Sequence, residues 1–184
     1  FPVVVGRVVA LRVARGDFVE DVERTDALAG GEVLNLEAAV GDVLDALCQT
    51  LGTGAQTWGF FGDPSYDLAL YDDMRSCLAE QVDIDLWRVS TSGMSAGGLW
   101  STYLSMHRAD SLATAFIMSG GTQSPNLPYK SPSQQMPVLL TWGGPQDTWG
   151  SGAYLIKFEE TMADFSMNLR RDGHFVVGCD HNGG

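Results

Sequence analysis

One serine in a run of small residues is the first position in this sequence that could perform covalent chemistry. The segment Gly93-Met94-Ser95-Ala96-Gly97 fits the pattern G-x-S-x-G and follows the strand-like stretch LWRVST. This pattern is typical of a sharp turn between a strand and a helix, which exposes the serine hydroxyl and needs small flanking residues. At the start of that helix, the backbone N–H of Ala96 could stabilise an oxyanion. The pattern predicts Ser95 as a nucleophile and Ala96 as an oxyanion donor, with an ordinary glycine-rich turn as the alternative.

A serine nucleophile needs a general base, and the base needs an acid that orients it. Asp147 follows the strand-like segment PVLLTW, and His181 follows the segment HFVVGC. Both residues therefore lie beyond the carboxyl end of an expected strand, at the edge of a parallel sheet where active sites form. The chain order Ser95, Asp147, His181 is that of the α/β-hydrolase triad. We expect Asp147 to be the acid and His181 the base, although an ordinary turn aspartate would also suit the neighbouring Gly and Pro residues.

Tryptophans near the expected strand ends could line an apolar cleft. Trp58, Trp142 and Trp149 occupy such positions, and loops often carry binding residues. They are candidates for binding an aryl ester or a polyester chain, with packing at the rim of the core as the alternative. The other two histidines favour structural interpretations, because His107 lies on an expected helix and His174 opens an expected strand.

The spacing of apolar residues predicts strands that alternate with helices. The expected strands cover residues 2–13, 86–91, 113–121, 137–142 and 174–179. The expected helices cover residues 32–51, 71–82, 99–110 and 154–165. This alternation predicts an α/β fold in which helices flank both faces of a mostly parallel sheet.

Composition limits the size of the fold and the kind of partner. A chain of 184 residues suits a single domain over residues 1–184. The net charge of −12 argues against nucleic acid and against an anionic membrane surface. The sequence also lacks an apolar run near the ~20 residues that span a bilayer. A neutral or apolar substrate fits this composition better.

The cysteines do not indicate a metal centre or a redox motif. Cys48, Cys77 and Cys179 share no C-x-x-C spacing, and the adjacent residues 179–181 offer no spaced partner ligands. We therefore expect neither a metal nor a cofactor. The pairing of the cysteines and the oligomeric state stay open at this point.

Three separated segments resemble those of a known family of enzymes. DLWRVSTSGMSAGGLWSTYLSMHRADSLATAFIMSGG, MPVLLTWGGPQDTW and HFVVGCDHNGG resemble secreted α/β-hydrolases related to poly(3-hydroxybutyrate) depolymerases and to feruloyl or acetylxylan esterases. The resemblance covers about residues 66–184, whereas residues 1–57 match the family poorly. It implies an α/β-hydrolase-like fold, a serine esterase with Ser95 as nucleophile and Asp147 as acid, and a secreted or periplasmic location.

Two departures from the family lead to competing hypotheses. The family histidine usually follows a glycine pair, as in GGH, whereas this sequence ends at Gly183-Gly184. We therefore expect a C-terminus that is cut short, with either His181 or a residue beyond Gly184 as the base. The loop that supplies a second oxyanion donor is also not recognisable over residues 6–57. The alternative function is a catalytically impaired hydrolase-like binding module or fragment, and peptidases, thioesterases and lipases share the same constellation.

Overall fold

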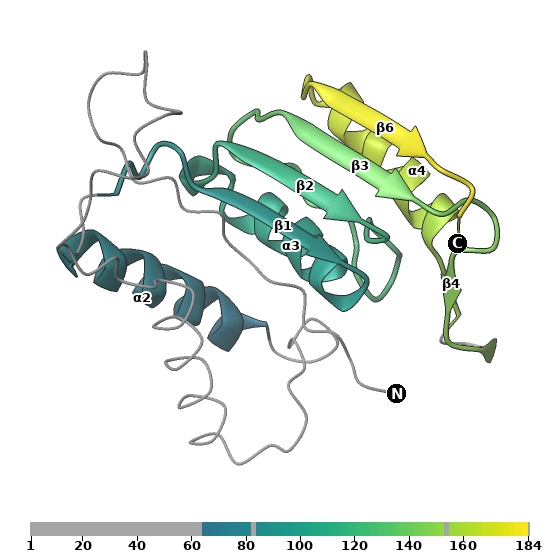
Figure 1. The fold of residues 1–184 in the computed structure, drawn as a ribbon, viewed down its shortest axis with the longest axis horizontal. Coiled ribbons are helices and arrows are strands. Elements are labelled where there is room, and N and C mark those ends of the chain that lie inside the picture. The colour runs from purple at the N-terminus through teal and green to yellow at the C-terminus, as the bar shows by residue number, and fades with distance from the viewer. Residues whose placement is uncertain (1–63, 82–83, 153–154, 184) are drawn as a thin grey trace, which may run out of the picture. The chain divides into compact units, whose positions relative to one another are not determined.

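The described part of the chain is built on a four-stranded parallel sheet. The computed structural model describes residues 64–81, 84–152 and 155–183, all of which belong to one compact unit. The strand order is β1-β2-β3-β6 (Figure 1). These strands are β1 (Ser90–Met94), β2 (Thr114–Met118), β3 (Val138–Trp142) and β6 (Val176–Asp180). All three pairings are parallel, which confirms the predicted sheet.

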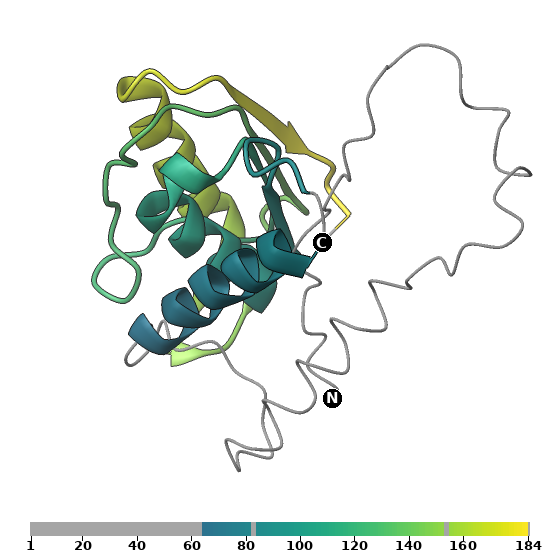
Figure 2. The same ribbon diagram turned by 90° about the vertical axis from the view of Figure 1, so that its left-hand side faces the viewer.

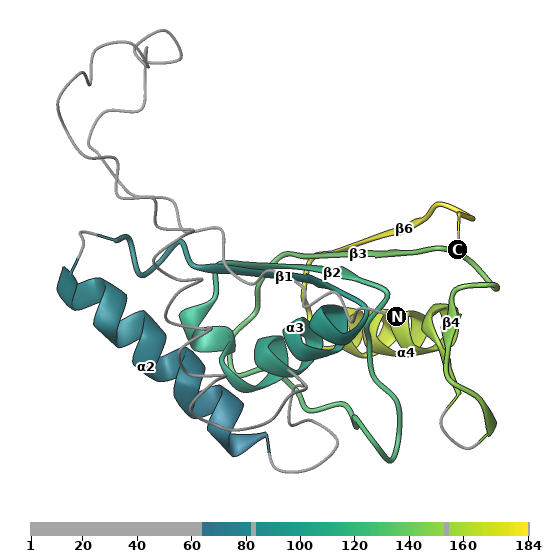
Figure 3. The same ribbon diagram turned by 60° about the horizontal axis from the view of Figure 1, so that its bottom comes forward.

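Helices connect these strands and cover one face of the sheet. They are α2 (Ser65–Gln81), α3 (Ala96–His107), the short 3-10 turn η2 (Ala109–Ser111) and α4 (Phe158–Arg171). Helix α3 packs on β1 and β2, and α4 packs on β3 and β6. Figures 2 and 3 show the helices on the same side of the sheet. In the described ranges, none of the helices is long and apolar enough to span a bilayer.

Side chains join α2 to the rest of this layer. The Tyr71 hydroxyl lies 2.8 Å from Ser111 Oγ, and burial raises the pKa of the Tyr71 phenol. Asp72 accepts hydrogen bonds from the Arg108 guanidinium, the shortest at 2.6 Å. An antiparallel pair, β4 (Thr148–Trp149) and β5 (Ile156–Lys157), lies between β3 and α4 in the chain.

The core lies between the sheet and the helices because side chains alternate between the two faces of each strand. Ile117 and Leu140 are fully buried on the helix side. Their neighbours Phe116 and Leu139 pair across the opposite face and are 36% and 38% exposed. Among the described residues, no helix covers that opposite face (Figure 3). The predicted strands over 2–13 and the predicted helix over 32–51 lie outside the described residues.

Two elements begin four residues later than the sequence predicts. The strand expected over 86–91 begins at Ser90, because Asp85 accepts the backbone N–H groups of Trp87 and Arg88 in a turn. The helix expected over 154–165 begins at Phe158, after Ile156 and Lys157 pair as β5. In both cases apolar residues that precede the element continue its apolar pattern, so the sequence predicts a start that is too early.

The described cysteines are not joined to each other. Cys77 and Cys179 are both exposed and carry free thiols. Cys48 lies outside the described residues, so its pairing stays open.

The alternation of buried and exposed side chains on β3 predicts that truncating two adjacent leucines has very different effects on the free energy of unfolding. Leu140→Ala should reduce the free energy of unfolding by about 2–5 kcal/mol, because it opens a cavity at a fully buried position. Leu139→Ala should cost less than about 1 kcal/mol, because its side chain already contacts solvent. Urea unfolding of the two variants and the parent measures both values. Equal losses would contradict the solvent exposure of the second sheet face.

Candidate active site

Ser95 occupies a sharp turn between β1 and α3. Its backbone has φ 55° and ψ −118°, a conformation that non-glycine residues rarely adopt. The Ser95 N–H donates to the Met118 carbonyl at 3.0 Å, and the Ser95 carbonyl accepts the Leu99 N–H at 2.9 Å. Ser95 thus joins the end of β1 to the start of α3 and is hydrogen-bonded to β2 through its backbone. Strained backbone of this kind clusters at functional sites, and the half-buried Ser95 has the predicted turn geometry.

Glycines around this turn are required by close backbone contacts. A Cβ atom at Gly93 would overlap the Gly97 carbonyl, and one at Gly98 would overlap the Met118 carbonyl. A side chain at either position would therefore force the strand and helix apart. These contacts argue against an ordinary glycine-rich turn. The G-x-S-x-G pattern identified Gly93 and Gly97, whereas the need for Gly98 becomes visible only when β2 is in place.

Ala96 is the first residue of α3. The first N–H groups of a helix have no acceptor within the helix, and their aligned dipoles favour negative charge. Ala96 directly follows Ser95 and is half-buried. Its backbone is therefore suited to bind an oxyanion formed at the serine.

Asp147 lies in the turn that follows β3 and is held through several atoms. Its N–H donates to the Gly144 carbonyl at 3.0 Å, and its carbonyl accepts the Phe158 N–H at 3.0 Å. Its carboxylate Oδ2 accepts the Ser119 hydroxyl at 2.6 Å and the Gly143 N–H at 2.9 Å. In the described ranges Oδ1 accepts no hydrogen bond, so it is the oxygen that could receive the N–H of a base.

His181 directly follows β6 and lies beside the Asp147 turn. Its backbone N–H donates to the Trp142 carbonyl at 3.1 Å, and a Cβ at Gly144 would come within 2.6 Å of Asn182 Oδ1. The His181 ring is exposed, and its Nδ1 accepts the Gly183 N–H at 3.2 Å. Among the described residues no hydrogen bond joins this ring to Ser95 or Asp147. The structure brings the two loops together without closing the predicted triad.

The other two histidines lie at the opposite edge of the sheet. His107 ends α3, and its pKa is lowered to about 4 by burial and by the nearby Lys130 and Arg108. His174 precedes β6, is buried, and accepts the Met136 N–H at Nδ1. The chain has three histidines, so only His181 lies at the carboxyl edge that also carries Ser95.

The three tryptophans proposed to line a cleft have different surroundings. Trp142 packs against the core, with its ring 3.5 Å from the position of a Cβ at Gly178. Its buried indole N–H finds no acceptor in the described part of the chain. Trp149 lies on β4 and is 58% exposed. Trp58 lies outside the described residues.

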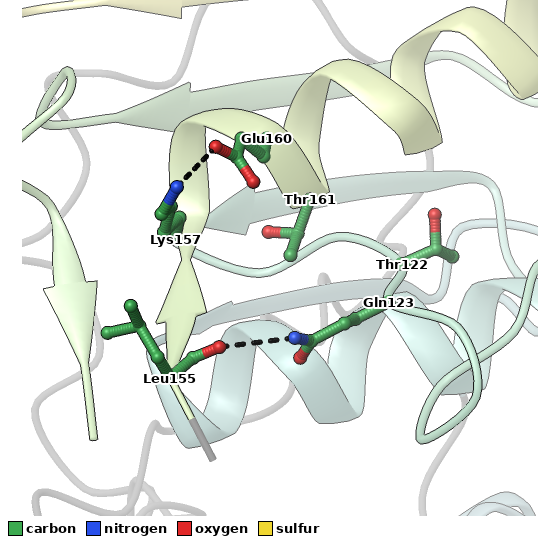
Figure 4. Close-up of a pocket in the computed structure, with 6 residues that line it drawn as sticks. All are labelled: Thr122, Gln123, Leu155, Lys157, Glu160 and Thr161. Carbon is green, nitrogen blue, oxygen red and sulfur yellow. Dashed lines mark hydrogen bonds and ion pairs between the residues drawn. The ribbon is translucent and has the colours of Figure 1, made fainter. Parts of the chain in front are cut away.

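A polar pocket of about 170 Å³ lies near the start of α4 (Figure 4). Lys157 and Glu160 form an ion pair of 2.8 Å on one side, and Gln123 donates to the Leu155 carbonyl at 3.2 Å on the other. The lining residues are Thr122, Gln123, Leu155, Lys157, Glu160 and Thr161. Sequence reasoning missed this pocket because its two walls come from segments about 30 residues apart that share no motif.

Alanine substitution tests the close contact at the turn. Gly→Ala inside a helix normally stabilises it by ~1 kcal/mol, but at Gly98 the added methyl group overlaps the Met118 carbonyl. We expect Gly98→Ala to lower the free energy of unfolding by about 1–3 kcal/mol, as overpacking does. Gly178→Ala is the control, because the nearest atom to its Cβ would be 3.5 Å away. If urea unfolding gave Gly98→Ala the same free energy of unfolding as the parent, the contact would be refuted.

Comparison with known proteins yields structural similarity alone. No protein-family model and no curated protein matches the chain. The crystal structure of a thermostable esterase is similar with a TM-score of 0.50 and 18% identity, over 65% of this chain and 29% of that chain. The native structure of sOPH is similar with a TM-score of 0.49 and 19% identity, over 64% of this chain and 46% of that chain. The matched region thus spans less than half of either solved chain. Together with the parallel sheet and the turn at Ser95, the likeness to the esterase structure shows an α/β-hydrolase-like fold.

Proposed function

We propose that this chain is a serine hydrolase of carboxylic esters that works by acyl transfer. The observation that carries the proposal is the backbone of Ser95, whose positive φ presents a serine between a strand end and a helix N-terminus. Such a turn serves nucleophilic serines on this kind of sheet. The esterase-like neighbour agrees with this reaction class.

The reaction has two acyl-transfer steps. The Ser95 Oγ attacks the ester carbonyl carbon while the base takes the hydroxyl proton. The Ala96 N–H binds the resulting oxyanion. The intermediate collapses, the C–O bond to the alcohol breaks, and the base returns its proton to the leaving alcohol. Water then attacks the acyl-serine by the same path, which releases the acid and restores Ser95.

His181 is our candidate for the base, and Asp147 is our candidate for the acid that orients it. The proposal is supported by the position of His181 at the same sheet edge and by Oδ1 of Asp147, which accepts no hydrogen bond from the described residues. In the mechanism, the His181 ring leaves the Gly183 N–H and turns toward Oδ1 of Asp147.

A second candidate function is a hydrolase-like binding module without efficient turnover. The observation that favours it is the exposed ring of His181, whose hydrogen bond goes to Gly183 and not to the acid. Without a base, the Ser95 hydroxyl is a weak nucleophile. This candidate predicts binding of an ester without hydrolysis.

We propose small, aryl or polyester-type esters as substrates, with Trp58, Trp142 and Trp149 as contacts for the acyl or alcohol group. The net charge of −12 supports an uncharged substrate over a nucleic acid or an anionic membrane. The resemblance to secreted esterases supports a secreted or periplasmic location. A panel of ester, thioester and peptide substrates separates the esterase from the related hydrolases.

Removing the nucleophile tests the proposal. Ser95→Ala should lower kcat for p-nitrophenyl acetate and butyrate by roughly 10³-fold or more, because it removes the group that forms the acyl-enzyme. Ser92→Ala is the matched control, since Ser92 lies on β1 three positions earlier. His181→Ala should cause a similar loss if His181 is the base. Equal turnover in Ser95→Ala and the parent would eliminate the mechanism.

Labelling by a fluorophosphonate separates the two candidate functions. The esterase predicts rapid stoichiometric labelling of the parent that disappears in Ser95→Ala. The binding module predicts no labelling of either protein, because an unactivated hydroxyl does not attack the phosphorus. Labelling that survives His181→Ala would identify a different base.

Exposure makes Trp149 the clearest test of aromatic substrate contacts. Trp149→Ala should raise KM for p-nitrophenyl butyrate several-fold more than for the acetate, because the longer acyl chain contacts more apolar surface. The fold of the variant is checked by its thermal midpoint, which should match the parent because the side chain is 58% exposed. Equal effects on both esters would argue against the contact.

A further inference from the structure

Ser119 is a second serine with an unusual backbone at the carboxyl edge of the sheet. It directly follows β2 and has φ 47°, in the left-handed region. Its N–H donates to the Thr141 carbonyl of the neighbouring segment at 2.9 Å. Glycine and asparagine adopt this backbone most easily, and Gly120 and Gly121 follow in the chain. A serine at this position therefore needs an explanation from its side chain.

The side chain of Ser119 donates to the acid of the proposed triad. Its Oγ lies 2.6 Å from Asp147 Oδ2, a short distance that is typical of a hydroxyl bound to a carboxylate. The Gly143 N–H donates to the same oxygen at 2.9 Å. Two donors from two different strand ends thus fix one carboxylate oxygen. The other oxygen, Oδ1, accepts no hydrogen bond from the described residues and stays available to a base.

The backbone around Ser119 is also packed against the turn of the nucleophile. The preceding residue, Met118, accepts the Ser95 N–H. A Cβ at Gly120 would come within 2.6 Å of the Gly98 carbonyl in α3. Residues 118–120 therefore contact the nucleophile turn through their backbone and the acid through one hydroxyl. No other described side chain makes a hydrogen bond to the Asp147 carboxylate.

We propose that Ser119 is a positioning residue that holds the Asp147 carboxylate so that Oδ1 faces the base. This inference rests on the proposed function, since it assigns a role within the same site. Ser119 does not touch the substrate or the reacting atoms. Its hydroxyl restricts rotation of the carboxylate, and its strained backbone aims the hydroxyl at Asp147.

Two variants separate the hydroxyl from the backbone. Ser119→Ala removes the hydroxyl and keeps a Cβ in the strained conformation, whereas Ser119→Gly removes the hydroxyl and the strain together. We expect both to lower kcat for p-nitrophenyl butyrate roughly 10- to 100-fold, as loss of a hydrogen bond to a charged group would. KM should stay within about twofold of the parent because the substrate contacts are unchanged. A parent-like kcat in either variant would overturn the proposal.

A double-variant cycle gives a readout that does not depend on turnover. Ser119→Ala, Asp147→Ala and the double variant are compared with the full parent chain by thermal unfolding. If the hydroxyl holds the carboxylate, the loss of Tm in the double variant is smaller than the sum of the single losses, because both remove the same interaction. Additive losses would overturn the proposal.

The two readouts distinguish failure of this inference from failure of the proposed function. An inactive parent chain with coupled Tm losses would reject the esterase and still support Ser119 as the residue that orients Asp147. An active parent whose turnover depends on Ser95, with kcat unchanged in Ser119→Ala, would keep the esterase and reject the positioning role.

Discussion

The backbone contact between Ser95 and Met118 is the constraint on which the rest of this site depends. The positive φ of Ser95 turns the chain from β1 into α3 within one residue, so the helix begins against the carboxyl ends of β1 and β2. That approach leaves no space for a Cβ at Gly93 or Gly98. Strand pairing, helix packing and the position of the serine hydroxyl are therefore coupled. Interiors this closely packed respond to added atoms by shifting backbone, and here any shift would move Ser95.

Parallel pairing then brings residues that are distant in the chain to the same edge. The register aligns Gly93 with Ile117, Ile117 with Leu140, and Leu140 with Gly178. The loops that follow these strands consequently leave the sheet side by side. This alignment lets the hydroxyl of Ser119 reach Asp147, 28 positions later. The strand ends lie next to one another because their order in space is fixed by backbone hydrogen bonds.

Local patterns predicted much of this arrangement, and contacts between distant segments supplied the rest. The strands β2 and β3 follow from their apolar runs, and the turn at Ser95 follows from glycine spacing within five residues. The start of β1 differs from the predicted one because Leu86 and Trp87 are apolar, whereas the strand itself is Ser-Thr-Ser-Gly-Met. Its polar Thr91 is buried and donates to Ser101 Oγ at 3.1 Å. Strand pairing and helix packing therefore make this segment a strand in spite of its polar residues. The Ser119–Asp147 bond has no pattern in the sequence, since it exists only once β2 and β3 are adjacent.

The three residues of the proposed triad are held in place to different degrees, and this difference has a mechanistic consequence. Ser95 and Asp147 are half-buried and fixed by backbone hydrogen bonds to neighbouring segments. The backbone of His181 is fixed by the Trp142 carbonyl, while its ring faces solvent beside Gly183. A general base must meet the nucleophile and the acid at once, so its position needs the most precision. In the proposed mechanism, the hydrogen bond from Ser119 would restrict rotation of the Asp147 carboxylate, because one anchored oxygen leaves the other in a fixed direction. If His181 is the base, as proposed, the rate of acyl transfer would depend on how often its ring meets that fixed oxygen.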